Sequence, residues 1–401
     1  MADKSNTDTY PLGRAVTLAQ LEADPYPVYA QLRAFEPISW IEALGIWYIT
    51  RYEDVRAIAI DQARFTTAFD RSLILDTFGS QMLSAEGVEH DRYRRALQAR
   101  FVSAYVRQTY EAAIHTSAAR LIDGFKQAGV VELRTQFAAR LPILTMLTLF
   151  GMPLEGEVRM RSWYDSFERA LSNFTHDDEV RRLAHAAVRQ FHDYVDEGMR
   201  MVANRSEPNL LSMLVNAPAA ERLSRAEIRR NVSIIFFGGI STVEALILNS
   251  LWALFEYPDT LERARAAPAL LPKVIEETVR WLGPVQSATR HVVHDTTYAG
   301  VQFAAGAAVN CMLAAANRDP SVFALPDRFD IDRTNLQRHL GFAAGTHACL
   351  GLHLARAEGR IALEHLLAEL PGLRLNREKS TAPSGYEFRQ PRSMCVTWDK
   401  P

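Results

Sequence analysis

Apolar side chains recur at helical spacing over most of this chain. The run 352–370 places them on one face, as a long amphipathic helix does. The same period covers most of 103–215. Ser224 and Glu227 form a capping-box pattern ahead of an apolar run that reaches about Tyr257, which predicts a second long helix.

Strand patterns are few and short. The stretch 37–52 is typical of two strands joined by a tight turn. Further strands are expected at 291–293 and within 301–313, and 385–398 is expected to form a C-terminal hairpin.

Two aromatic-rich stretches have an open interpretation. Residues 62–85 lack a clear period and form either a loop that covers the core or a loop that binds a ligand. Trp163, Phe167 and Phe174 recur at helical spacing, which is typical of core packing and also of one wall of a binding site.

Composition is ordinary for a globular protein, with 401 residues of which 48% are hydrophobic and 23% charged. The formal net charge is −2 and no long run has a single sign, so nucleic acid is not an expected partner. Three cysteines are an odd number, which argues against a disulfide framework and fits a reducing compartment.

No membrane segment is expected. The polar N-terminus lacks a hydrophobic signal region. The most apolar stretches, 141–154 and 232–251, are short or interrupted by glycine and polar residues, whereas a membrane span needs ~20 apolar residues. We therefore expect a cytoplasmic protein without a membrane anchor.

Cys349 lies where the glycine-punctuated stretch 339–351 meets the predicted helix. Backbone N–H groups and the helix dipole at such a junction favour a thiolate, which is the metal-binding form of cysteine. Three interpretations are open: a buried thiol that packs as a small hydrophobe, a zinc site shared with His347 and His353, or a single thiolate on haem iron. No second Cys/His cluster supplies a fourth zinc ligand at a familiar spacing.

The residues around the cysteine resemble the haem-binding signature of the cytochrome P450 family. The matching positions are Phe342, Gly345, His347, Cys349 and Gly351. The resemblance covers essentially the whole chain and implies haem b (iron protoporphyrin IX) as the cofactor. Cys349 would be the axial ligand of the iron.

The resemblance also implies a mainly α fold with a smaller β-rich lobe, arranged as a triangular prism. Residues 1–401 would form a single domain. The β-rich lobe would comprise about 37–52, 285–313 and 380–399, and the helical lobe the remainder.

Cationic side chains match the family's partners for the haem propionates. His90 and Arg94 are four residues apart, so they share a helix face. Arg290 and His347 match two further propionate partners. Two carboxylates need charge-assisted donors, and arginine supplies a planar fork of N–H groups.

The family also has a Glu-Arg-Arg cluster that braces the cysteine loop. Glu277 and Arg280 are three residues apart on one predicted helix face, and Arg328 follows ahead of the loop. Their implied role is structural.

Two adjacent glycines, Gly238 and Gly239, lie inside a predicted helix, where each costs ~1 kcal/mol relative to alanine. Either close helix packing or a flat ligand against the backbone would require them. The string resembles the family's oxygen-binding kink, in which Thr242 supplies a hydroxyl. It departs from that kink at Ser241, where the family has an acid; Glu244, one helical turn further, is a candidate substitute.

The resemblance implies a monooxygenase that uses dioxygen and two electrons. Thr242 and Ser241 would handle protons, with Gly239 beside the bound oxygen. Because the chain has no flavin or nicotinamide motif, its electrons are expected from a ferredoxin or flavodoxin with its NAD(P)H-dependent reductase. The enzyme is expected to act as a monomer on a small molecule.

The expected reaction is hydroxylation or O-dealkylation of a small apolar substrate, with methoxyaromatics as one candidate class. An apolar substrate is expected because the residues predicted to line the substrate pocket are uncharged. They are Phe69, Phe78, Phe167, Phe174, Val285, Ala288 and Phe388.

Two alternatives are open. The departure at Ser241 motivates a haem-thiolate enzyme that uses hydrogen peroxide directly or performs a non-oxygenase reaction. A non-catalytic haem sensor or carrier is the other alternative.

Overall fold

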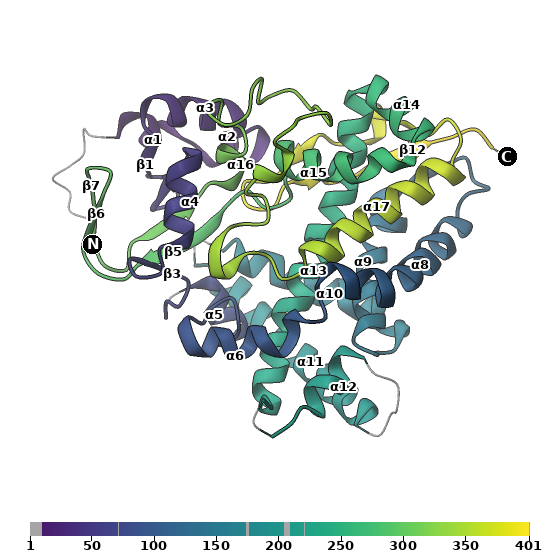
Figure 1. The fold of residues 1–401 in the computed structure, drawn as a ribbon, viewed down its shortest axis with the longest axis horizontal. Coiled ribbons are helices and arrows are strands. Elements are labelled where there is room, and N and C mark those ends of the chain that lie inside the picture. Colours follow the sequence, from purple (N-terminus) through teal and green to yellow (C-terminus); the bar gives the residue numbers. More distant parts are fainter. Residues whose placement is uncertain (1–9, 71, 174–175, 204–208, 220, 401) are drawn as a thin grey trace. The chain divides into compact units, whose positions relative to one another are not determined.

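The computed structural model describes residues 10–70, 72–173, 176–203, 209–219 and 221–400, with the elements shown in Figure 1. The chain divides into two compact units. Unit 1 comprises Met1–Thr67, Ala245–Cys349 and Leu375–Met394, and unit 2 comprises Ala68–Glu244, Leu350–Arg374 and Cys395–Pro401. Neither unit is continuous in sequence.

Unit 1 combines helices with most of the strands. Its helices are α1 (Pro11–Ala15), α2 (Leu18–Ala23), α3 (Tyr26–Phe35), α4 (Tyr52–Ile60), α14 (Pro258–Ala266), α15 (Leu271–Trp281) and α16 (Leu313–Ala316). Its strands are β1 (Ile38–Ile41), β2 (Ile46–Ile49), β3 (Phe65–Thr66), β5 (Ala288–Val292), β6 (Thr296–Tyr298), β7 (Val301–Phe303), β8 (Ala308–Cys311), β10 (Pro383–Ser384) and β11 (Gln390–Pro391).

A five-stranded sheet in the order β1-β2-β8-β5-β3 organises unit 1. The predicted hairpin over 37–52 is confirmed as β1 and β2, with Trp40 opposite Trp47. β2 and β8 run parallel, and the other neighbours are antiparallel. β6 and β7 form a separate hairpin, as do β10 and β11.

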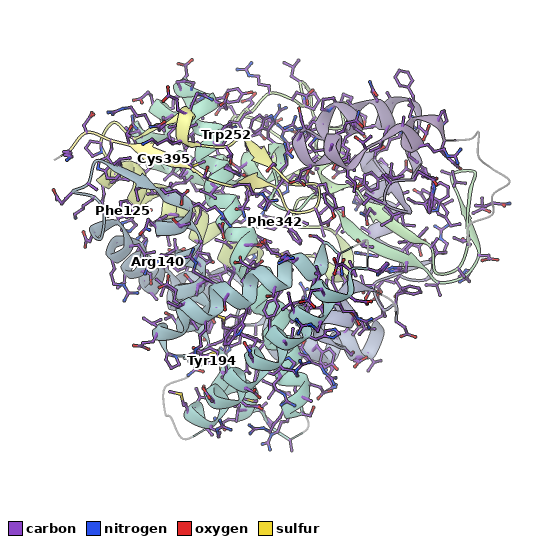
Figure 2. The ribbon with its side chains drawn as sticks, turned by 180° about the vertical axis from the view of Figure 1, so that it is seen from behind. Phe125, Arg140, Tyr194, Trp252, Phe342 and Cys395 are labelled. Atoms are coloured by element: carbon purple, nitrogen blue, oxygen red, sulfur yellow. The ribbon has the colours of Figure 1, made fainter. Side chains whose placement is uncertain are left out.

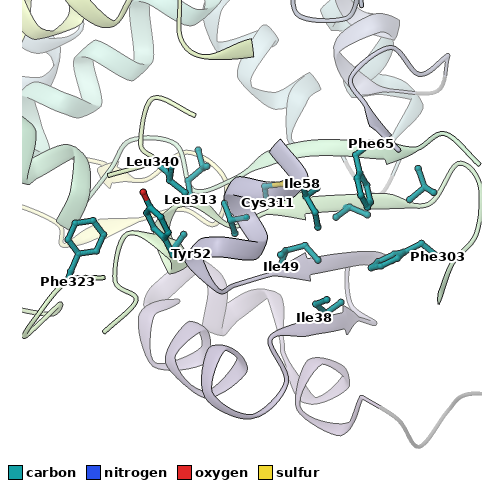
Figure 3. Packing of buried hydrophobic residues seen from close by; sticks show 14 residues of the cluster. Ile38, Ile49, Tyr52, Ile58, Phe65, Phe303, Cys311, Leu313, Phe323 and Leu340 are labelled. Atoms are coloured by element: carbon teal, nitrogen blue, oxygen red, sulfur yellow. The ribbon is translucent and has the colours of Figure 1, made fainter. Parts of the chain in front are cut away.

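Alternation along β2 divides the core of unit 1 between the two faces of the sheet. Ile49 packs in the cluster that includes Tyr52 and Ile58 of α4, as Figure 3 shows. The preceding residue, Tyr48, belongs to a second cluster with Tyr29 of α3. The sheet is therefore covered on both faces by apolar side chains.

Unit 2 is almost entirely helical. Its helices are α5 (Leu73–Phe78), α6 (Gly87–Gln98), α7 (Ser103–Tyr105), α8 (Glu111–Asp123), α9 (Arg140–Leu149), α10 (Glu157–Leu171), α11 (Asp178–Val202), α12 (Leu210–Val215) and α17 (Leu352–Glu369). π-helical turns occupy Val106–Tyr110 and Arg134–Ala138. Three strands, β4 (Val130–Glu132), β12 (Cys395–Thr397) and β9 (Arg374–Leu375), form a sheet in the order β4-β12-β9.

Packing in unit 2 joins helices that are neighbours in sequence and helices that are distant in sequence. α8 and α17 lie side by side (Figure 1). At the start of α9, Arg140 Nη2 is 3.0 Å from Glu157 Oε2 at the start of α10. Tyr194 of α11 donates its hydroxyl hydrogen to the Pro153 carbonyl oxygen at 3.1 Å; Figure 2 labels Arg140 and Tyr194.

α13 (Arg225–Glu256) is the longest helix and passes from unit 2 into unit 1. Its predicted capping box is confirmed: Glu227 N–H donates to Ser224 Oγ at 3.3 Å, and Ser224 N–H donates to Glu227 Oε2 at 2.7 Å. Within the described chain α13 is the one helix long and apolar enough to span a membrane by length and composition, but 83% of its most apolar window is buried. That burial is typical of a core helix.

Three predicted elements differ from the structure. Residues 385–398 do not form one hairpin, because β12 pairs with β4, with Cys395 opposite Glu132. The stretch 62–85 contains a short helix, α5, begun by Ser72 Oγ, which accepts from Leu75 N–H. β4 interrupts the predicted helical region 103–215. The prediction of a mainly α fold with a smaller β-rich part is confirmed.

Candidate functional site

The loop before α17 holds Cys349 in unit 1. Gly345–His347 form a single 3-10 turn, and the Cys349 N–H then donates to the Phe342 carbonyl oxygen at 2.9 Å. Gly351 is the N-cap residue of α17. Cys349 therefore precedes a helix N-terminus by a few residues, where a negative charge is favoured.

Gly345 fixes the path of this loop. Its φ of +76° is a left-handed conformation, and a Cβ there would lie 3.1 Å from Ile60 Cγ2 and 3.2 Å from the Ala59 carbonyl oxygen. The glycine is thus required by contact with α4. A Cβ on Gly351 would meet nothing within 4 Å among the described residues.

The three cysteines have different surroundings. Cys311 and Cys395 are buried, whereas Cys349 is partly exposed. Burial raises the pKa of the Cys311 thiol to about 11, so it stays protonated at neutral pH. The zinc interpretation finds no support in the described residues, because no three or more His, Cys, Asp or Glu side chains are placed to hold a metal ion.

Unit 1 also carries two of the predicted propionate partners. Arg290 on β5 is 4% exposed, and its Nη1 donates to the Thr289 carbonyl oxygen at 2.9 Å. Its Nη2 is buried without a hydrogen-bond partner among the described residues. His347 Nε2 lies 3.1 Å from Thr67 Oγ1. A buried guanidinium nitrogen without an acceptor fits a carboxylate ligand such as a haem propionate.

His90 and Arg94 lie on one face of α6 in unit 2, as their spacing predicts. His90 is 2% exposed, and its Nδ1 lies 3.3 Å from Asp91 Oδ1. Arg94 is partly exposed.

A strip of accessible surface crosses the buried middle of α13. Between residues 231 and 251, Gly238 is exposed and Gly239 and Thr242 are partly exposed, while every other residue is buried. Thr242 Oγ1 donates to the Gly238 carbonyl oxygen at 2.5 Å. A Cβ on Gly239 would lie 3.0 Å from Met146 Sδ. Gly238 and Thr242 thus leave accessible surface along the helix, whereas Gly239 is required by close packing against α9.

Ser241, one residue before Thr242, is 3% exposed and bonded to Tyr164 of α10. The Tyr164 hydroxyl also lies 3.1 Å from the Phe237 carbonyl oxygen. One turn further along α13, Glu244 is 4% exposed, and its Oε1 accepts from Arg134 Nε at 2.6 Å. Sequence reasoning missed Tyr164 and Arg134, because each comes from another helical segment.

Comparison with known proteins identifies the chain. The cytochrome P450 family model matches residues 37–267 and 269–371. This chain belongs to the cytochrome P450 family. It is 32% identical to Nocardicin C N-oxygenase of Nocardia uniformis subsp. tsuyamanensis over 98% of this chain and 100% of that protein. It is 30% identical to Biotin biosynthesis cytochrome P450 of Bacillus subtilis (strain 168) over 94% and 96%, respectively.

Solved structures show the same fold. The crystal structure of P450BioI in complex with hexadec-9Z-enoic acid ligated acyl carrier protein is 29% identical, with a TM-score of 0.86 over 94% of this chain and 99% of that one. Cytochrome P450 proteins bind haem, so haem is the cofactor of this one. Its relatives include proteins named as oxygenases and hydroxylases, and this P450 is an oxidoreductase.

The predicted Glu-Arg-Arg cluster of this P450 needs one correction. Glu277 and Arg280 pair at 2.6 Å and both are fully buried. The third member is Arg333, whose Nε is 3.0 Å from Glu277 Oε1, and not Arg328. The Arg328 side chain is exposed, and its carbonyl oxygen accepts from Arg280 and from Arg333. A turn at Asp330, whose N–H donates to Glu277 at 2.7 Å, directs residue 333 towards the cluster.

Pocket candidates in unit 2 gather around Phe78. Phe78 and Phe167 meet edge-on with ring centroids 5.2 Å apart, and Phe237 lies 5.8 Å from Phe78. Phe69 is partly exposed, and Phe174 lies outside the described residues. A cavity of about 320 Å³ in the same unit is lined mainly by polar residues such as Asp70, Asp76 and His185; of the described phenylalanines, Phe69, Phe78 and Phe167 do not line it. Phe78 lines a second cavity, of about 310 Å³.

Pocket candidates in unit 1 lie where two extended segments meet. Val285 and Phe388 form an antiparallel bridge, and both are partly exposed. Ala288 begins β5 and packs against the core cluster of α4 and the sheet.

A buried carboxyl on α17 was also missed. Glu358 is fully buried, and neither carboxyl oxygen has a hydrogen-bond partner among the described residues. Thr145 is close, but its hydroxyl donates to the Leu141 carbonyl oxygen at 3.0 Å. Burial raises the pKa of Glu358 to about 8, so this carboxyl is mostly protonated at neutral pH. The position of Glu358 on the apolar face of the predicted helix is the sequence signal that could have indicated this burial.

Proposed function

We propose that this P450 is a monooxygenase that uses dioxygen and two electrons from separate redox proteins to hydroxylate or O-dealkylate a small apolar substrate, including an aromatic one. The observation that carries the proposal is the loop of Cys349, a partly exposed cysteine ahead of a helix N-terminus. A haem iron with a thiolate ligand favours cleavage of the O–O bond.

Each candidate residue then has a defined task. Cys349 supplies the thiolate. Arg290 and His347, together with His90 and Arg94, donate hydrogen bonds to the propionates. The unpaired Nη2 of buried Arg290 supports this assignment. Phe342, Gly345 and Gly351 shape the cysteine loop.

Thr242 and Gly239 form the accessible strip of α13, and Thr242 holds or passes a proton there. The Thr242 hydroxyl donates to Gly238, which leaves its oxygen free to accept a second bond. Ser241 takes part through Tyr164, to which it is bonded.

Electrons come from protein partners. Bacterial P450 proteins use redox partner proteins and small-molecule substrates. A ferredoxin or flavodoxin with its NAD(P)H-dependent reductase would serve this chain, which would work in the cytoplasm as a monomer. The acyl carrier protein bound to a structural relative makes a carrier-borne acyl chain a second substrate form to test.

An apolar substrate is supported by the side chains of the candidate pocket. Phe78 and Phe167 contact each other, and Val285 bridges Phe388. A spectral screen of the haem protein tests this choice. 4-Methylanisole is expected to shift the haem absorption, whereas benzoate is not. A shift with benzoate alone would overturn the apolar assignment.

The departure at Ser241 favours one alternative, a P450 that uses hydrogen peroxide directly. Turnover of 4-methylanisole with dioxygen, ferredoxin and reductase, together with slower turnover by peroxide, is expected. Turnover with peroxide alone would contradict the proposed function and support the alternative. A sensor or carrier would give no turnover by either route.

A further inference from the structure

Ser241 forms a fixed hydrogen-bonded pair with a buried tyrosine. Tyr164 is 6% exposed, and its ring stacks on Phe237 with centroids 5.6 Å apart and 7° between the planes. Its hydroxyl bonds Ser241 Oγ and lies 3.1 Å from the Phe237 carbonyl oxygen. A hydroxyl has one proton to donate and lone pairs to accept another, so the pair can pass a proton along.

Two carboxyls lie beside this pair, each one helical turn from one of its members. Glu244 follows Ser241 on α13, and Glu168 follows Tyr164 on α10. Burial is the main cause that raises the pKa of Tyr164, and the charges of Glu168 and Glu244 add to it. Burial also raises the pKa of Glu244, and Glu168 adds to that rise. Glu244 is 4% exposed, whereas Glu168 is partly exposed, so Glu168 reaches solvent and Glu244 is buried.

Incorporating one oxygen atom of dioxygen and reducing the other to water consumes two electrons and two protons. Serine is not a net source of protons, because its hydroxyl must regain every proton that it gives. We propose that Glu168 and Glu244 supply protons through Tyr164 to Ser241 and Thr242, and so replace the acid missing at position 241. This inference rests on the proposed function.

Protons balance along this path. Glu244 gives its proton to the Tyr164 oxygen through a bridging water, the Tyr164 proton passes to Ser241, and the Ser241 proton passes to the strip that carries Thr242. Glu168 returns a proton from solvent to Glu244. No oxidant or reductant is involved in these transfers.

The charges around Glu244 suit a proton donor. Burial is the main cause that raises its pKa to about 7, and Glu168 adds to it, while Arg134 and Arg161 oppose the rise. Both protonation states of Glu244 are therefore populated near neutral pH. The Arg134 pair holds the carboxyl in place at 2.6 Å.

Infrared titration of the haem protein tests the path without turnover. Burial raises the pKa of Glu358 to about 8 and that of Glu387 to about 7, so the wild-type difference spectrum is expected to contain several carboxylic-acid C=O bands that titrate near neutral pH. One of these bands, that of Glu244, should disappear in Glu244→Gln. Tyr164→Phe should shift its midpoint. Glu157→Gln, which alters the similar Arg140 pair, and Tyr194→Phe should leave the band unchanged. A spectrum from which Glu244→Gln removes no band, or in which Tyr164→Phe leaves the midpoint of the Glu244 band unchanged, would overturn the proposal.

Turnover of 4-methylanisole provides a second readout. Peroxide brings its own two protons, so Tyr164→Phe and Glu244→Gln should lower the ratio of dioxygen-driven to peroxide-driven rates by about tenfold or more. Adding Ser241→Asp to Tyr164→Phe should restore that ratio. Equal losses on both routes would indicate a structural role and contradict the path. If wild type shows no dioxygen-driven turnover, the proposed function is wrong. The infrared titration then remains the test of the proton path through Tyr164.

Discussion

At the scale of single residues, Arg333 and Arg328 both contact the cluster around Glu277, but through different groups. The Arg333 guanidinium reaches buried Glu277 at 3.0 Å, while Arg328 contributes only its carbonyl oxygen. Sequence order indicated the cluster but not its third member, because the turn at Asp330 decides which arginine points inward.

We predict that Arg333→Ala lowers the free energy of unfolding by about 3 kcal/mol, because it removes one partner of a buried ion pair. Arg328→Ala removes an exposed side chain and should change it by less than ~0.5 kcal/mol. Urea denaturation of both variants measures the difference. Equal losses in the free energy of unfolding would contradict the assignment of Arg333 as the third member of the cluster.

Glu358 gives a pH-dependent prediction. Burial raises its pKa from 4.5 to about 8, so between these values the unfolded chain releases a proton that the folded chain keeps. The contribution of the neutral carboxyl is complete below 4.5 and is lost as pH rises through about 8. Glu358→Gln keeps the group neutral, so its stability relative to wild type should increase between about pH 5 and about pH 8.

Denaturation midpoints at the two pH values measure this trend. Glu364→Gln is the control, because that side chain is 42% exposed on the same helix and pairs with Arg360. A flat difference between Glu358→Gln and wild type would show that the carboxyl is not neutral in the folded protein.

At the scale of elements, the cysteine loop depends on how closely it approaches α4. Gly345 and Gly300 both have left-handed φ values, +76° and +81°, but only a Cβ at Gly345 would meet neighbours within 4 Å. Gly300→Ala should therefore cost only the conformational term of about 1–2 kcal/mol. Gly345→Ala should cost more, because Ile60 and the Ala59 carbonyl must also move.

Thermal unfolding of the two glycine variants compares these costs directly. Retention of haem by each variant shows whether the loop keeps its path. A Gly345→Ala protein as stable as Gly300→Ala would mean that α4 does not constrain the loop.

Elements with local signals were predictable from the sequence. The capping box of α13 and the β1–β2 hairpin follow from neighbouring residues. The pairing of β12 with β4 does not, because its partners lie more than 250 residues apart and neither short strand specifies the other. The bond between Tyr164 and Ser241 was missed for the same reason.

At the scale of the whole molecule, spaced motifs carried the prediction of family and cofactor. Cys349 and four residues around it indicated the P450 family, and the comparison with known proteins confirmed it. The third member of the bracing cluster and the surroundings of Ser241 needed three-dimensional contacts. The cofactor could thus be predicted from a motif, whereas the proton path and the substrate depend on side chains that no motif fixes.

The absorption spectrum of the reduced protein under carbon monoxide shows whether Cys349 ligates the haem iron. Wild type, Cys311→Ala and Cys395→Ala should all give the spectrum of a thiolate-ligated haem. Cys349→Ala should lose it, and Cys349→His should bind haem with the spectrum of an imidazole ligand. A thiolate spectrum that persists in the Cys349 variants would show that Cys349 is not the ligand of the haem iron.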